Sequence, residues 1–282
     1  MKPKFILDKI FYLLMLLSAL LVFGFFASII WSIAKTGFPA LSWDMVTKIP
    51  GGGFYLGKDG GILNAIVGSI MIVGSSSVLG LLISLPIVFY MNVYVKSSSR
   101  LSSLIRLTYD VLFGIPSIVY GAFAFTIMVY LGWKASLLGG ILVTTLLIIP
   151  IFVRSMDEVV RAIPKDFLNA TYSLGATKLE TCKVIVRQIA PGIATATLLS
   201  VGRAIGDAAG VLFTAGFTDN IPTSLDQPAA TLPLAVFFQL NSPVPEVRER
   251  AYASALLLTG IVFVISLAGR LLSNVFSKNR IK

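Results

Sequence analysis

The sequence contains no histidine, and it has only one cysteine, Cys182, among its 282 residues. Without histidine the chain lacks the commonest metal ligand and general base, and a lone thiol cannot form a disulfide within the chain. Charged residues are also scarce, at 13% of the chain, whereas an average soluble domain has about 25%. The composition therefore excludes most enzymatic chemistry and leaves too little charge for an ordinary solvated surface.

Long apolar segments make up much of the chain instead. Hydrophobic residues account for 56% of the sequence, and the mean hydropathy is +0.88. Because a membrane-spanning helix needs about 20 mostly apolar residues, the pattern predicts an all-α integral membrane protein with one domain, residues 1–282. The six predicted spans are 10–33, 62–94, 104–131, 137–152, 190–217 and 251–274. The core is expected at 62–275, and the first span is too long for the apolar region of a cleaved signal.

The positive charges are distributed unevenly between the ends of these spans. Most of the 23 lysines and arginines fall on one side, and the net charge is +10. The positive-inside rule then places both termini in the cytoplasm. This placement explains the basic charge without a nucleic-acid partner. Two long connections, 37–60 and 218–250, are expected outside, where loops of this length usually serve a function.

The polar segment 156–188, between the fourth and fifth predicted spans, has the signals of two helices. Pro164 suits the first turn of a helix, and Gly175 suits the left-handed residue that ends one. Thr177-Lys178-Leu179-Glu180 then forms a capping box. The segment is therefore predicted to be a short helix, a glycine turn and a second helix that runs into span five. The short helix either covers the ends of the bundle or inserts into a groove on another subunit.

Arg203 lies in the middle of the fifth predicted span, and Asp207 follows at i+4 on the same predicted helix face. Gly202, Gly206 and Gly210 form a stripe of small residues beside them, which lets another helix approach closely. One interpretation is a buried ion pair with a helix-packing seam. The other is an anion pathway, in which the guanidinium of Arg203 binds an oxyanion and the carboxylate of Asp207 keeps the arginine from trapping that anion.

Pro116 interrupts the third predicted span. Proline removes one helix hydrogen bond and frees a carbonyl group, and within a membrane that carbonyl must find a partner or line a cavity. The sequence is consistent either with a packing kink at Pro116 or with a pathway lined by Ser117.

Three motifs carry a resemblance to a known family. Asn169-Ala170-Thr171, followed after three residues by Gly175, resembles the EAA motif of ABC importer permeases, with Asn169 and Thr171 in place of Glu and Ala. The run from Gly202 to Asp207 resembles the GRAIGE signature of phosphate-uptake permeases, with Asp at its end. Residues 114–121 are similar to the G-x-PSIV-x-G segment of that family. The similarity extends over nearly the whole chain.

This resemblance implies a type I, MetI-like permease fold with six transmembrane helices and a cytoplasmic coupling helix. It implies that the chain forms the pathway for inorganic phosphate across the bacterial inner membrane, within surrounding lipid. The implied partners are a homologous second permease, an external phosphate-binding protein and two ATPase subunits, which bind ATP and Mg²⁺ while this chain binds no cofactor. Of the matching positions, Arg203, Asp207 and Ser117 would line the pathway, and Asn169, Ala170, Thr171 and Gly175 would couple it to the ATPases.

Other functions fit part of the pattern. The chain could carry another oxyanion, such as sulfate or molybdate, or be the first rather than the second permease of a phosphate importer. A secondary anion transporter without an ATPase would also use broken helices and a charge at mid-membrane, but it has no need for the helix–glycine–helix segment. A membrane enzyme lacks a suitable base or metal cluster in this sequence.

Overall fold

The structure is a computed structural model that describes residues 2–51, 60–95 and 99–277, and helices dominate it. This confirms the prediction of an all-α membrane protein. Part of the predicted external connection 37–60 lies outside the described residues.

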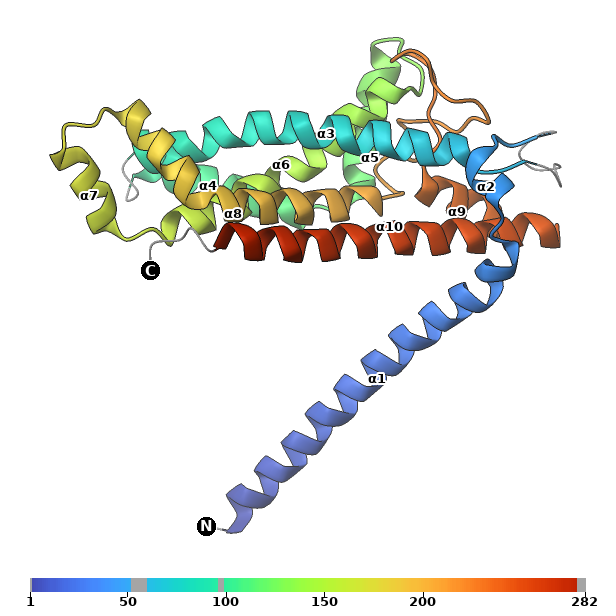
Figure 1. The fold of residues 1–282 in the computed structure, drawn as a ribbon, viewed down its shortest axis with the longest axis horizontal. Helices are drawn as coiled ribbons and strands as arrows, with labels where there is room; N and C mark the ends of the chain where they lie inside the picture. The colour runs from blue at the N-terminus through green and yellow to red at the C-terminus, as the bar shows by residue number, and fades with distance from the viewer. Residues whose placement is uncertain (1, 52–59, 96–98, 278–282) are drawn as a thin grey trace.

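Four long helices form the body of the molecule and run side by side (Figure 1). Two of them contain the predicted spans 137–152 and 251–274, and a third covers most of the predicted span 62–94. Their mostly apolar sequences make each long enough to cross a membrane. They are α3 (Leu63–Phe89), α6 (Leu137–Arg161), α8 (Lys178–Ile205) and α10 (Pro245–Ser277).

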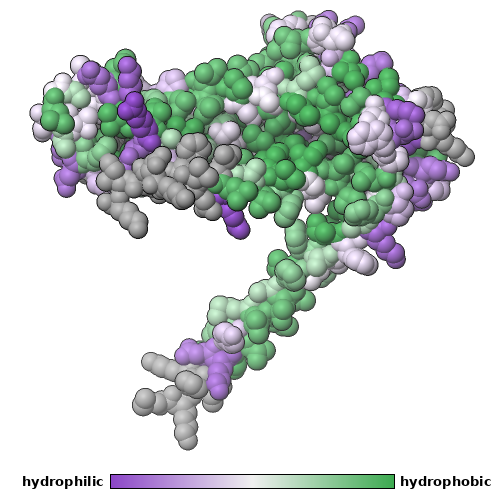
Figure 2. All heavy atoms as spheres, in the orientation of Figure 1, coloured by the Kyte–Doolittle hydropathy of each residue, from purple (hydrophilic) through white to green (hydrophobic). Residues whose placement is uncertain are grey.

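Helix α1 (Lys2–Ala40) leaves this body and projects away from it (Figure 1). It contacts α10 near its end, where a Cβ on Gly37 would lie 2.7 Å from the carbonyl oxygen of Tyr252. The short helix α2 (Trp43–Thr47) follows. Figure 2 shows hydrophobic side chains over most of α1 and over the middle of the bundle, with hydrophilic ones gathered at the bundle ends. This distribution is that of a protein surrounded by lipid.

The third predicted span, 104–131, is not a single kinked helix. It consists of α4 (Arg100–Gly114) and α5 (Ser117–Tyr130), which meet at an angle of 97°. Five helices of the described chain are long and apolar enough to span a membrane, or six if this bent pair is counted as one span. The prediction of a span interrupted at Pro116 was therefore right about the position but underestimated the break.

The two ends of the bundle carry different short elements. At one end α7 (Lys165–Ser173) connects α6 to α8, and α3 finishes in a π-helical turn, η1 (Tyr90–Tyr94). At the other end lies α9 (Leu232–Leu240), inside the stretch 218–250 that was predicted to be a long external connection. Most side chains of α9 are buried against the bundle, so this connection is part of the fold.

The largest cluster of buried side chains joins α3, η1, α6 and α8, and Tyr109 adds α4 to it. Met91, Phe152, Met156 and Ile185 are fully buried within it. Because these side chains come from three separate elements, they fix those elements relative to one another on the α7 side of the molecule.

Candidate functional site

Arg203 lies in the last turn of α8, at the end of that helix farthest from α7. The prediction of one continuous helix over 190–217 is wrong, because α8 ends at Ile205 and Gly206 forms its C-cap. Residues 206–217 continue as turns. Their apolar composition made them look like the rest of a span, although glycine favours the end of a helix.

The turns of 206–217 pack against other parts of the protein. The backbone N–H of Ser136 donates to the carbonyl oxygen of Thr214 at 2.8 Å, and the N–H of Ala229 donates to that of Ala215 at 2.9 Å. Val211, Thr214 and Ala215 are buried. Irregular backbone is tolerated at membrane depth only where protein or water satisfies its polar groups. The chain thus forms a broken helix, a feature typical of substrate sites in transporters.

Asp207 does not pair with Arg203. The carboxylate of Asp207 is buried, and one of its oxygens accepts a hydrogen bond from the backbone N–H of Gly210 at 2.8 Å. The predicted i, i+4 relationship is wrong because the chain turns after Ile205. Arg203 itself is exposed, and within the described part of the chain it has no hydrogen-bond or ion-pair partner.

The predicted glycine packing seam is also absent from this chain as far as it is described. A Cβ on Gly202 would meet nothing within 4 Å, and one on Gly206 would meet only the carbonyl oxygen of Gly202 at 3.9 Å. Gly210 belongs to the turn, where a Cβ would lie 2.6 Å from an Asp207 oxygen. Gly202 and Gly206 therefore leave open space beside Arg203 instead of holding another helix of the same chain.

The break at Pro116 lies against these turns. Proline at this position cannot donate to the carbonyl oxygen of Leu112, which accepts instead from the hydroxyl of Tyr120 at 2.8 Å and from the N–H of Ile115 at 3.2 Å. The predicted free carbonyl has thus found partners. A Cβ on Gly121 would lie 2.6 Å from the carbonyl oxygen of Gly210, so the first turns of α5 pack closely on the 206–217 segment. Ser117 is buried at this contact, with 8% of its surface exposed.

A groove of about 480 Å³ opens between α4, α6 and α8, and Arg203 lines it. Apolar side chains near the break and on α6 and α8 form most of its wall. Its polar lining consists of Arg154, Ser155, Glu158 and Arg203. The described residues contain no group of three or more histidine, cysteine, aspartate or glutamate side chains placed to hold a metal. The groove thus has two arginines and one glutamate on a mostly apolar wall.

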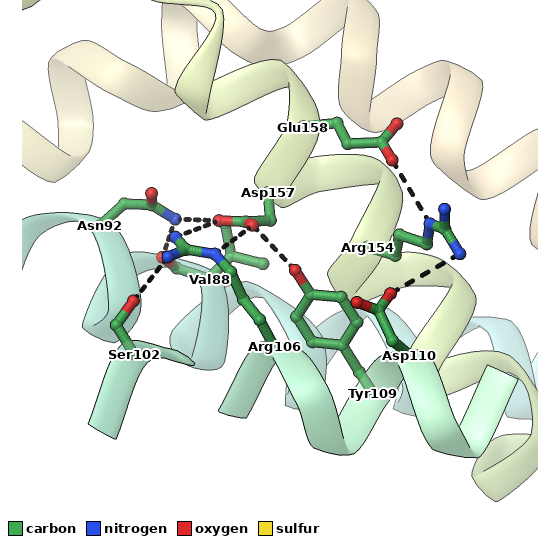
Figure 3. A network of polar contacts seen from close by, with 9 residues as sticks. All are labelled: Val88, Asn92, Ser102, Arg106, Tyr109, Asp110, Arg154, Asp157 and Glu158. Atoms are coloured by element: carbon green, nitrogen blue, oxygen red, sulfur yellow. Dashed lines mark hydrogen bonds and ion pairs between the residues drawn. The ribbon is translucent and has the colours of Figure 1, made fainter. Parts of the chain in front are cut away.

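A buried ion pair, which was not predicted from the sequence, lies next to the groove (Figure 3). Asp157 of α6 is 1% exposed and accepts from Nε of Arg106 at 2.9 Å. Asn92 of η1 also donates to this carboxylate at 2.7 Å, and the hydroxyl of Tyr109 donates at 2.9 Å. The network joins η1 and α4 to α6, which lies 51 to 65 residues away along the chain. The sequence shows that Arg106 and Asp157 are charged, but it does not show which residues pair, because the pairing depends on the tertiary fold.

The polar segment 156–188 has the predicted form of two helices joined by a glycine turn. Gly175 has φ +81°, and Thr177 and Glu180 make both hydrogen bonds of the capping box at the start of α8. Asn169, Ala170 and Gly175 are exposed. The half-buried Thr171 donates its hydroxyl to the carbonyl oxygen of Phe167 at 2.9 Å.

Large apolar side chains of the segment 156–188 are also exposed. Leu174 is 89% exposed, and Leu179 and Tyr172 are exposed as well. These exposed apolar side chains are not covered by the rest of the chain as it is described.

The family described as binding-protein-dependent transport system inner membrane component matches residues 76–282, which is most of the chain. The chain belongs to this family. It is accordingly a multi-pass transport component of an ABC importer, in which a separate subunit is the ATPase.

Several curated relatives carry the name phosphate transport system permease protein PstA. The protein from Pasteurella multocida is 33% identical over 269 residues, which cover 92% of each chain. The protein from Haemophilus influenzae is 31% identical and covers 86% of this chain and 85% of its own. PstA 1 of Mycobacterium tuberculosis is 33% identical over 78% of this chain and 73% of its own.

Among solved structures, the fold is similar to that of the MetNI methionine ABC transporter in an inward-facing conformation. The TM-score is 0.62, and the match covers 76% of this chain and 95% of that chain at 17% identity. At this identity the similarity establishes the fold, and it confirms the expected MetI-like permease architecture.

Proposed function

We propose that this chain is a permease subunit of an ATP-driven importer of inorganic phosphate and forms part of the pathway across the membrane. The observation that carries this proposal is the exposed guanidinium of Arg203, which lies at a broken helix in the 480 Å³ groove without a partner among the described residues. The phosphate transport named for the relatives supports the choice of substrate.

The chemistry of Arg203 suits a phosphate ion. A guanidinium is always charged and offers planar, paired N–H donors that match two oxygens of an oxyanion. Asp207 supplies a buried negative charge four residues along the chain, and its hydrogen bond from Gly210 leaves acceptor capacity for a protonated ligand. Monohydrogen phosphate carries such a proton at neutral pH, whereas sulfate does not. Ser117, next to Gly210, would add a hydroxyl donor to the pathway.

A homologous second permease is the proposed partner within the membrane. The most apolar part of α1 is 0% buried within the chain, and Gly202 and Gly206 leave the side of Arg203 open. A second permease would cover these surfaces, complete the pathway as a heterodimer and leave the remaining apolar surface to lipid.

Two ATPase subunits are the proposed partners at the α7 end, which we place in the cytoplasm of a bacterial inner membrane together with both termini. These subunits would bind ATP and Mg²⁺, and this chain would bind neither. The exposed Leu174 and Leu179, with Asn169, Ala170 and Gly175, provide the docking surface for the ATPases. Closure of the ATPases would move α7 as a rigid body and switch the spans between two packings. The phosphate-binding protein would dock at the opposite, α9 end.

Phosphate uptake by the complete complex, reconstituted in vesicles with the binding protein outside and ATP inside, tests this function. We expect uptake that requires both ATP and the ATPase subunits and that an excess of sulfate leaves largely unchanged. Competition by sulfate or molybdate at equal concentration would favour a permease for another oxyanion. Uptake by the permease pair alone would identify a secondary transporter.

A further inference from the structure

A second arginine, Arg154 of α6, lines the same groove as Arg203. We infer that Arg154 is a second contact for the travelling anion, positioned on the α7 side of Arg203. The inference rests on the proposed function, because it assigns a further residue to the same pathway.

Two ion pairs connect α4 with α6, and they differ in a way that separates a structural role from a transport role (Figure 3). Arg106 and Asp157 form the inner pair at 2.9 Å, with side chains only 16% and 1% exposed. Arg154 and Asp110 form the outer pair at 3.6 Å, with side chains 44% and 52% exposed. A short, buried pair that is fully hydrogen-bonded holds its geometry. A long, exposed pair contributes little to stability and is readily exchanged.

The surroundings of Arg154 orient its guanidinium without occupying all of its donors. The ring of Phe113 lies 5.1 Å from the guanidinium carbon and faces it. Nε contacts Glu158 at 3.3 Å and Nη1 contacts Asp110 at 3.6 Å. A guanidinium has five N–H donors, so these two contacts leave others available for an oxyanion. The two carboxylates offset the charge of the two arginines and so limit trapping of an anion in the groove.

The order of the two arginines along the groove follows from the helices that carry them. Arg154 lies two turns before the end of α6, where the chain enters α7. Arg203 lies at the end of α8 farthest from α7. An anion that moves from Arg203 towards α7 along the groove therefore reaches Arg154 on its way out. With the α7 end in the cytoplasm, Arg154 is on the release side.

The test compares two variants that break the same ion pair. In the reconstituted complex, Arg154→Gln removes the cation, whereas Asp110→Asn removes its partner and keeps the cation. Phosphate uptake is measured over a range of phosphate concentrations. Co-purification of the ATPase subunits and the basal ATP hydrolysis rate report assembly. Arg100→Gln, an exposed arginine on α4 outside the groove, is the matched control.

We expect Arg154→Gln to lower the maximal uptake rate by ~10- to 100-fold, the change for losing a charge-assisted hydrogen bond. Asp110→Asn should lower the maximal uptake rate much less, and Arg154→Lys should have a higher uptake rate than Arg154→Gln. Equal losses in Arg154→Gln and Asp110→Asn would show that the pair is only structural and overturn the inference. Near-normal uptake in Arg154→Gln together with loss in Arg203→Gln would also overturn it but leave the proposed function intact. Near-normal uptake in both would reject the proposed function as well.

Discussion

Replacement of Asp157 by alanine should destabilise the protein more than any other single change in the α4–α6 contact. The carboxylate is 1% exposed and accepts hydrogen bonds from Arg106, Asn92 and Tyr109. Without it, Arg106 keeps only the hydrogen bond to Ser102 among the described residues, while 84% of its side-chain surface stays covered. Breaking a buried ion pair in this way costs about 3–5 kcal/mol.

Thermal unfolding of the purified protein in detergent measures this cost. With a change in Tm of about 2–4 °C per kcal/mol for a chain of this size, Asp157→Ala should lower Tm by ~6–20 °C. Asp110→Asn, which breaks the exposed outer pair, should cost about 1 kcal/mol or less. Arg106→Met with Asp157→Leu removes both charges and should recover most of the loss. A Tm for Asp157→Ala equal to that of Asp110→Asn would refute the assignment of Asp157 as a buried structural charge.

Three further predictions concern single positions. Gly175→Glu should uncouple ATP hydrolysis from phosphate uptake, since Gly175 has φ +81° and open space around it. Gly175→Asn should still transport phosphate, because asparagine tolerates this conformation. Unchanged coupling in Gly175→Glu would remove the coupling role. Tyr120→Phe should lower stability by about 0.5–1.5 kcal/mol, seen as a lower Tm, because Leu112 loses a hydrogen-bond donor. Gly210→Ala should lower Tm, because the added Cβ would lie 2.6 Å from a carboxylate oxygen of Asp207, whereas the Cβ of Gly202→Ala would meet nothing. Equal Tm values for the two variants would contradict the packing described.

The sequence predicted the features that depend on local signals. The structure contains the predicted capping box at Thr177 and the left-handed turn at Gly175. It also has helices at most of the predicted span positions. Each depends on residues within a few positions of one another, so the chain carries the information locally.

The features that depend on tertiary contacts were not predictable in the same way. Residues 206–217 are apolar because they are buried in protein, and hydropathy does not distinguish this from a helix in lipid. Pro116 predicts an interruption of the helix, but the 97° angle of the break depends on the packing of α5 against Gly210. The pairing of Arg106 with Asp157 joins residues from separate helices and has no local signal.

The most direct test of the central claim is phosphate uptake by the complete complex with Arg203→Gln. Glutamine keeps hydrogen-bonding capacity but removes the charge that we propose the phosphate contacts. We expect uptake to fall to background while the variant still co-purifies with its partner subunits and keeps the Tm of the unmodified protein, since Arg203 has no partner to lose among the described residues. Uptake close to that of the unmodified complex would contradict the account.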